Sequence, residues 1–335
     1  MKQKMKWRVV KYSILSYFVL ILFLFMVALF PQMDEVDIAL TIDVPYVIVR
    51  ELEGEFGSSF PYYLATAAMD LSCDWESYKE ERYIETLRTY NQRMLNDQYS
   101  YDDNFKTYFD IYQQAYGDIE CFVIAKETYE KKIKKRVKVK YTDSNGKTKT
   151  KYKTEYEYEV RLRTPSYDVY DDFGAERNYK EQTRHKGNDT IAAEMTPLVS
   201  MTGGVLERVG WNEHGGYRIG VRAPSGAYFY YAHMEEYGWE IEEGDLEQGD
   251  RIKPGQLLGY VGDTGYGPEG TEGKFVNHLH LQIGVKLEDY EGDFWVNPYN
   301  AMMFREDEKK ILDVYDDEDY PEIITNKEYK KWYKD

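Results

Sequence analysis

Asn277-His278-Leu279-His280-Leu281-Gln282-Ile283 is the stretch of this chain that says most about its fold. Polar and apolar side chains alternate through it, which is typical of a β-strand with one face in the core. This period sends His278 and His280 to one face and the leucine and isoleucine side chains to the other. Two imidazoles ~7 Å apart on one strand face can place one at a metal ion and one beside it.

The sequence around this stretch predicts more short strands. Residues 171–299 are rich in glycine and carry short apolar runs separated by turn residues, at 203–206, 217–221, 227–232 and 255–261. Short strands joined by glycine turns, with little helical periodicity, favour a compact and mainly antiparallel β domain.

All five histidines of the chain lie in this β region. His185 and Asp189 are four residues apart, and the Gly187-Asn188 pair between them argues against a helix. A bend there would bring the imidazole and the carboxylate to one point. His233 ends an aromatic run that begins at residue 230, whereas the Gly-Gly pair after His214 indicates a turn.

This set of side chains suits a zinc ion. Catalytic zinc sites use three protein ligands and leave one position for water, and two histidines with one aspartate fit that count. The remaining histidines can then move protons or stabilise a developing oxyanion. No H-E-x-x-H motif occurs, which excludes the helix-borne signature of many zinc peptidases.

The order of these motifs resembles the lysostaphin/LytM-type zinc endopeptidases of bacterial cell walls, metallopeptidase family 23. That family shows H-x-x-x-D, then Y-x-H, then H-x-H in a late strand. The matches here are His185/Asp189, Tyr231-Ala232-His233 and His278-Leu279-His280. The sequence between these motifs is also similar to the family, at 202–205, 249–259, 261–265 and 296–298. The resemblance covers residues 171–301.

The resemblance implies a duplicated-hybrid-motif-like β domain with one Zn²⁺ per chain. It implies that His185, Asp189 and His280 bind the zinc. His233 and His278 would be catalytic, activating water and stabilising the tetrahedral intermediate, and Tyr179 lies where relatives can carry an assisting tyrosine. The expected reaction is hydrolysis of peptide bonds in peptidoglycan cross-bridges or stem peptides. The alternative is a zinc-retaining scaffold of an extracytoplasmic envelope complex.

The N-terminus predicts a membrane anchor. Residues 12–30 carry no charge and, as a helix, would span ~28 Å, close to the thickness of a bilayer core. The basic segment 1–11 before them predicts a cytoplasmic N-terminus, with the rest of this single-pass chain outside the cytoplasm. A cleaved signal peptide is the rival interpretation, although no small-residue cleavage motif follows the apolar run.

Residues 31–130 are predicted to be mostly helical. Apolar and aromatic residues recur at three-and-four spacing in 74–95 and in 102–116, where Gly117 is a plausible end. Cys73 and Cys121 fall in this region, and a disulfide between them stays open because sequence cannot show that they approach. Two cysteines exclude a four-cysteine zinc site.

Residues 131–163 predict a β-hairpin. Two alternating runs flank Asn145-Gly146, a pair that favours a two-residue turn. That turn would place Lys132, Lys134 and Arg136 opposite Glu159, Glu157 and Glu155. It would leave a basic tip on the hairpin. The tip is either a contact for an anionic envelope polymer or lipid surface, or a solvated segment whose charges prevent aggregation through the strand edges.

The net charge of the chain and the order of its predicted parts limit the possible partners and give the fold class. The chain has 43 Lys and Arg against 60 Asp and Glu, a net charge of −17, which argues against nucleic acid as a partner. The predicted fold class is α+β: an N-terminal transmembrane helix, a helical region with a β-hairpin, then a mainly antiparallel β peptidase domain. A charged tail at 302–335 follows.

Overall fold

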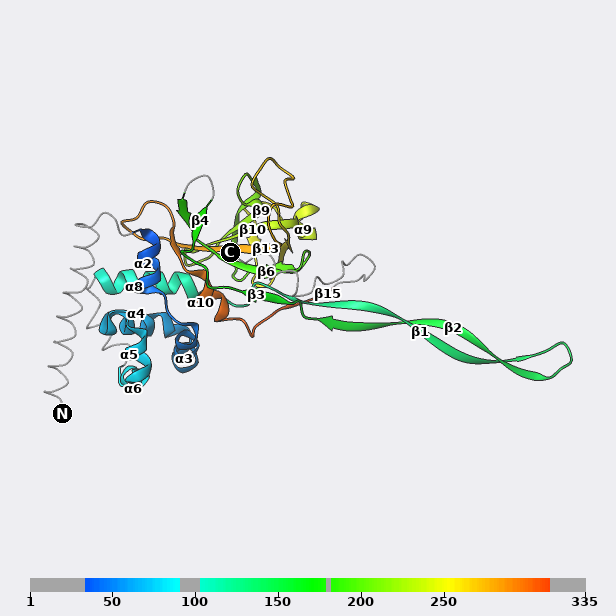
Figure 1. Ribbon diagram of the computed structural model, residues 1–335. Coiled ribbons are helices and arrows are strands. Elements are labelled where there is room, and N and C mark those ends of the chain that lie inside the picture. Colours follow the sequence, from blue (N-terminus) through cyan, green and yellow to red (C-terminus); the bar gives the residue numbers. More distant parts are fainter. Residues whose placement is uncertain (1–33, 91–102, 179–181, 314–335) are drawn as a thin grey trace.

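The computed structural model describes residues 34–90, 103–178 and 182–313. A group of helices lies on one side of a β domain, and a long two-stranded hairpin projects from the opposite side (Figure 1). The predicted transmembrane helix is corrected here. No helix within the described ranges is long and apolar enough to cross a membrane, and residues 12–30 lie outside them. The fold class is therefore a helical part plus a mainly antiparallel β domain.

The helical part is built around α4, which is buried on almost every side and packs against α8. Its elements are α2 (Glu35–Ile42), α3 (Tyr46–Phe56), η1 (Gly57–Ser59), α4 (Phe60–Leu71), α5 (Trp75–Glu80), α6 (Ile84–Leu87) and α8 (Asp103–Tyr116). The predicted helix over 102–116 corresponds to α8, and Gly117 follows its last residue. Tyr62 of α4 meets Phe105 and Phe109 of α8 edge to face, so that the aromatic stripe is a packing face.

The helical character expected for 74–95 is present over the described part of that range, although not as a single helix. The structure has two short helices there, α5 and α6, because Arg82 between them adopts a positive φ of 49° that a helix does not allow. Residues 91–102 lie outside the described residues. The open question of a disulfide is also answered, since Cys73 and Cys121 are both free.

The β domain is one large antiparallel sheet with short helices at its margin. Its central order is β11-β8-β9-β10-β13-β6-β3, with β12 and β14 beside it and the pair β4-β5 apart. The strands are β3 (Tyr167–Val169), β4 (Glu176–Asn178), β5 (Gln182–Arg184), β6 (Asn188–Ala192), β7 (Pro197–Val199), β8 (Gly204–Asn212), β9 (Gly216–Arg222), β10 (Tyr228–Tyr237), β11 (Arg251–Ile252), β12 (Leu257–Val261), β13 (His278–Val285) and β14 (Phe294–Val296). The helices are α9 (Trp239–Glu242) and α10 (Pro298–Met303).

The helical part and the β domain share one hydrophobic core. Helix α10 joins them: Phe304, just after it, packs on Phe60 of α4 and Tyr116 of α8. Arg50 of α3 donates to the carbonyl oxygens of Met303 and Phe304. The helices therefore support the sheet from one side, and α2 also contacts β5 and the bend after it through the ion pairs Asp37–Arg184 and Glu35–Lys186.

The hairpin consists of β1 (Lys126–Thr142) and β2 (Thr148–Arg163), and β15 (Ile311–Asp313) pairs with the base of β1. The predicted hairpin is present, but the predicted register is wrong by one residue: Lys132 pairs with Tyr158, not with Glu159. The cause is a longer turn. The Asp143 carboxylate accepts from the N–H groups of Asn145 and Lys147, and only Gly146 has a positive φ.

Candidate metal centre and active-site cleft

Strand pairing brings the predicted site residues together. His280 of β13 lies directly opposite Asp189 of β6, and on its other side it lies opposite Ala232 of β10. His233 follows Ala232, so three neighbouring strands present their side chains at one place. Leu279, Leu281 and Ile283 are fully buried on the other face of β13, as their alternation predicts.

His185 comes from the bend between β5 and β6. Its N–H donates to the carbonyl oxygen of Ala175, and its own carbonyl accepts from Gly174. The bend passes close to β13 at Gly187, where a Cβ would lie 2.5 Å from Cε1 of His280. Only glycine leaves room for both chains at that point, and this close approach places His185 beside His280.

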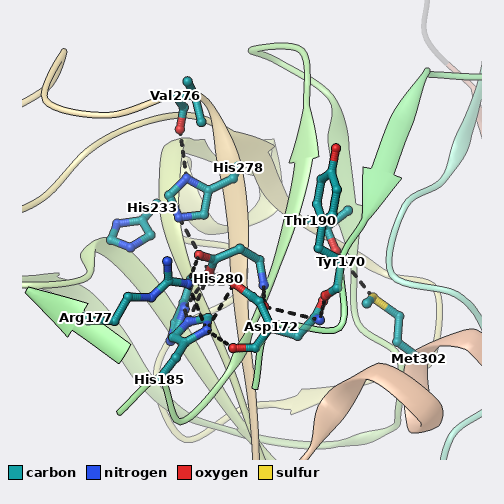
Figure 2. A network of polar contacts seen from close by, with 12 residues as sticks. Tyr170, Asp172, Arg177, His185, Thr190, His233, Val276, His278, His280 and Met302 are labelled. Carbon is teal, nitrogen blue, oxygen red and sulfur yellow. Dashed lines mark hydrogen bonds and ion pairs between the residues drawn. The ribbon is translucent and has the colours of Figure 1, made fainter. Parts of the chain in front are cut away.

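Three donor atoms converge at the centre of the network in Figure 2. Nε2 of His185 lies 2.9 Å from Nδ1 of His280. Oδ1 of Asp189 lies 2.9 Å from that same Nδ1 and 3.2 Å from Nε2 of His185. Two imidazoles and one carboxylate that meet in this way form a group able to hold a metal ion.

A second carboxylate fixes the orientation of His185. Oδ2 of Asp172, in the loop between β3 and β4, lies 3.2 Å from Nδ1 of His185, and its Oδ1 accepts from the N–H of Asp189 at 3.0 Å. A hydrogen bond at Nδ1 leaves the Nε2 lone pair for a metal. Neither Asp172 nor the contact itself was predicted, because the contact depends on how a loop folds back.

Arg177 of β4 is a further residue that the sequence did not indicate. Its guanidinium donates to Oδ2 of Asp189 at 2.7 Å. It also donates to Oδ2 of Asp172 at 2.6 Å, and Figure 2 labels both Arg177 and Asp172. It therefore occupies one oxygen of Asp189 and leaves the other, Oδ1, directed at the two imidazoles. Arg177 thus orients the carboxylate without filling the centre of the site.

His233 and His278 lie beside this centre, with ring centroids 4.8 Å apart. Each ring nitrogen Nδ1 lies near a backbone carbonyl oxygen, that of Thr264 for His233 and that of Val276 for His278. Nδ1–H donation to these carbonyls leaves Nε2 of both rings as the available nitrogen. Nε2 of His278 lies 3.7 Å from Oδ1 of Asp189.

The backbone of His233 is strained. Its φ is 63°, and the pairing of β10 with β9 shifts register between Tyr231 and Met234. A non-glycine residue in this conformation costs of order 1–3 kcal/mol and persists where the surroundings enforce it. The irregularity turns the imidazole of His233 toward the cleft, a placement that strict strand alternation would not give.

Without a metal, burial and charge shift several pKa values in this cluster. Burial lowers the pKa of His185, but the carboxylates of Asp172 and Asp189 outweigh this effect and raise it to about 9. Burial would raise the pKa of Asp189, yet the surrounding imidazoles hold it well below its usual range. Burial lowers the pKa of His233 and of His280.

These groups line a cleft of about 520 Å³. Tyr230, Tyr266 and Phe275 form aromatic walls, and His214 lies on the rim, edge-on to Tyr266. The predicted turn role of His214 agrees with its position after β8, although the residue also borders the cleft. Tyr179, predicted as an assisting tyrosine, lies outside the described residues.

Residues 183–291 match the sequence model of peptidase family M23. The chain contains an M23 peptidase domain. The match begins at the strand before His185 and includes Asp189, His233, His278 and His280. The family named from the histidine and aspartate motifs is therefore confirmed.

Curated proteins are similar to the M23 domain over part of their length. The L-Ala--D-Glu endopeptidase of Bacillus subtilis (strain 168) is 36% identical over 138 residues, which are 41% of this chain and 40% of that protein. Lysostaphin of Staphylococcus simulans is 30% identical over 100 residues, which are 29% of this chain and 17% of that protein. This chain thus spans less than half of each relative.

A solved structure is also similar. The putative glycyl-glycine endopeptidase lytM from Ruminococcus gnavus ATCC 29149 is 32% identical, with a TM-score of 0.46. The similarity covers 65% of this chain and 73% of that one.

Proposed function

We propose that the M23 domain of this chain is a zinc-dependent endopeptidase that hydrolyses peptide bonds in the cross-bridges or stem peptides of peptidoglycan. The observation that carries the proposal is the convergence of Nε2 of His185, Oδ1 of Asp189 and Nδ1 of His280 beside two further imidazoles. The Bacillus subtilis relative supports the substrate class, since it is named as an endopeptidase for the L-Ala--D-Glu bond.

The donor set fits zinc. Zn²⁺ prefers imidazole nitrogen and carboxylate oxygen, and three protein ligands are the usual number at a catalytic site. Asp172 and Arg177 orient two of the three donors, which matches the outer contacts that metal ligands need. His185, Asp189 and His280 would hold the ion. When bound, it would supply a Lewis acid and lower the pKa of water.

The remaining chemistry belongs to His233 and His278. When each donates through Nδ1 to a carbonyl oxygen, Nε2 of the neutral ring can accept a proton from the attacking water. In the protonated form the same nitrogen donates to a developing oxyanion or to the leaving amine. Their backbone partners keep both rings at the cleft wall, so little reorganisation accompanies each proton transfer.

The proposed substrate determines the compartment in which the M23 domain would act. The polymer lies outside the cytoplasm, and we infer that the described part of the chain acts there too. An anionic envelope polymer at the basic hairpin stays a prediction for the same setting. The alternative function, a zinc-retaining scaffold, keeps the metal but not the hydrolysis.

The test uses the purified full chain and a suspension of purified peptidoglycan. We expect the turbidity to fall with time, the fall to stop with a zinc chelator, and added zinc to restore it. A folded, zinc-loaded chain that leaves several wall types intact would overturn the proposed hydrolysis. Stable zinc binding without cleavage would instead support the scaffold.

A further inference from the structure

The hairpin has two chemically different faces, which its register defines. Residues paired across β1 and β2 lie on the same face, and every second residue of a strand shares that face. Because Lys132 pairs with Tyr158, the even-numbered residues form one face and the odd-numbered residues the other. We refer to these as the even face and the odd face.

Cations and tyrosines gather on the even face. From 132 to 158 it carries a row of basic residues on β1 and a row of tyrosines and threonines on β2, and no Asp or Glu. The basic row is Lys132, Lys134, Arg136, Lys138 and Lys140, and the tyrosines are Tyr152, Tyr156 and Tyr158. Arg136 lies over the ring of Tyr152 at 4.2 Å, and Lys132 lies over that of Tyr156 at 5.2 Å.

The odd face is partly neutralised. Lys135 pairs with Glu157 at 2.7 Å, and Lys153 with Glu155 at 3.5 Å. By contrast, no carboxylate of the described residues pairs with Lys134, Lys138 or Lys140. The even face therefore keeps its charge for an outside partner, although the chain as a whole carries a net charge of −17.

The even face is also exposed over a long distance. β1 has 17 residues, or ~56 Å at ~3.3 Å per residue, and most of it stands clear of the body (Figure 1). The tyrosines of this face, with Val160 and Leu162 nearer the base, are between 53% and 64% exposed. Neighbouring cations on one strand face are spaced by ~7 Å. The partner must therefore be long, anionic and able to pack against rings.

The shape of the hairpin favours a linear polymer over a flat membrane surface as its partner. Its two strands coil around each other along their length (Figure 1), as two-stranded ribbons do. The even face consequently rotates along the hairpin, and a flat bilayer would meet only part of the basic row. A flexible linear chain can follow the rotation and contact every cation in turn.

We propose that the even face of the hairpin binds a linear polymer of the cell envelope that carries a phosphate group in each repeat. The basic row of β1 binds successive phosphates, and the tyrosines of β2 pack against the groups between them. The hairpin thus holds the M23 domain on the polymer-bearing wall. This binding is independent of the proposed peptidase activity.

The test measures binding of the full chain to long-chain inorganic polyphosphate by titration calorimetry at several salt concentrations. The even-face variant replaces Lys134, Arg136 and Lys138 by Gln. The matched odd-face control replaces Lys149, Lys151 and Lys153 by Gln and removes the same number of charges. Circular dichroism checks that both variants keep the fold of the unmodified chain.

We expect the even-face variant to bind at least ~10-fold more weakly and to lose about one unit of salt slope per contact removed. The control should change affinity by less than ~3-fold. Equal losses in both variants, or no binding by the unmodified chain, would overturn the proposal. Tighter binding to phosphatidylglycerol vesicles or to oligothymidylate than to polyphosphate would assign the face to a different partner and would overturn it too.

Discussion

Asp172 and His185 form a carboxylate–imidazole pair in which the aspartate oxygen Oδ2 lies 3.2 Å from Nδ1 of the histidine. On the other side of the same ring, Nε2 lies 2.9 Å from Nδ1 of His280. The carbonyl oxygen of Asp172 lies 3.1 Å from the same Nδ1, so that Asp172 offers two acceptors there and leaves Nε2 free for a metal. The pair links a loop of the β domain to the chemistry of the cleft.

Replacing Asp172 by Asn should weaken zinc binding by about 10- to 100-fold, because Nδ1 of His185 loses its charged partner and keeps only the carbonyl oxygen of residue 172. The amide oxygen can still accept from the N–H of Asp189, so the loop should keep its fold. Competition with a chromogenic chelator measures the affinity. Glu176→Gln, which removes an exposed charge on β4, is the control. Unchanged zinc affinity in the Asp172 variant would refute this role.

His278 and His280 should differ when replaced by Ala. His280→Ala removes a donor atom that lies 2.9 Å from both other donors, and zinc should be lost. His278→Ala should keep about one zinc per chain and lose turnover, since its Nε2 stands 3.7 Å from Asp189. Metal analysis of the two purified variants measures their zinc content, and a wall-hydrolysis assay measures their turnover. Equal loss of zinc in the two would contradict the division of roles.

Gly187→Ala should disturb the site without touching a donor residue. The added Cβ would lie 2.5 Å from Cε1 of His280 and 2.6 Å from the carbonyl oxygen of Leu281, so the bend and the ring must separate. We expect zinc affinity to fall by at least ~10-fold, the size of effect seen when a ligand loses its support. Gly54→Ala in α3 is the control, because a Cβ added there would meet no atom of another part of the chain within 4 Å. It should leave zinc binding unchanged and stabilise the helix by ~0.5–1 kcal/mol.

Asp43 should make stability fall as the pH rises. Burial raises its pKa to about 7, against the hydrogen bond from Asn300 and with the help of the Asp171 charge. Between the ordinary value of 3.8 and about 7, the folded chain therefore binds a proton that the unfolded chain has lost. The free energy of unfolding should decrease by a few kcal/mol through this window.

The Asp43→Asn variant isolates this effect. It removes the titration while its amide oxygen can still accept from Asn297 and Asn300. Relative to the unmodified chain, the variant should gain stability as the pH rises from 4 to 8 in urea unfolding. Asp245→Asn, at an exposed position, should leave the pH dependence unchanged. Parallel curves for the unmodified chain and Asp43→Asn would contradict the assignment.

Much of the β domain could be predicted from local patterns. Alternation in 277–283 gave the direction of His278 and His280, and the glycine between His185 and Asp189 indicated the bend that joins them. These features depend on residues close in sequence. The resemblance to a known family then supplied the expected roles of the five site residues.

Other features depend on contacts that a linear pattern does not contain. Asp172 and Arg177 reach the site through the packing of β3, β4 and β6, and no spacing rule marks them. The positive φ of His233 follows from a register shift in β10. The observed hairpin register differs from the predicted one by one residue because the Asp143 side chain caps a longer turn. In the observed register the tyrosines of β2 share a face with the basic row of β1.

The most direct test of the central claim is mass spectrometry of the fragments that the full chain releases from purified peptidoglycan, with and without a zinc chelator. We predict soluble peptide-bearing fragments whose new amino and carboxyl termini define one type of peptide bond. These fragments should be absent with the chelator and with His278→Ala. Fragments that persist under both conditions, or none from a zinc-loaded chain on any wall type, would contradict a zinc endopeptidase built on His185, Asp189 and His280.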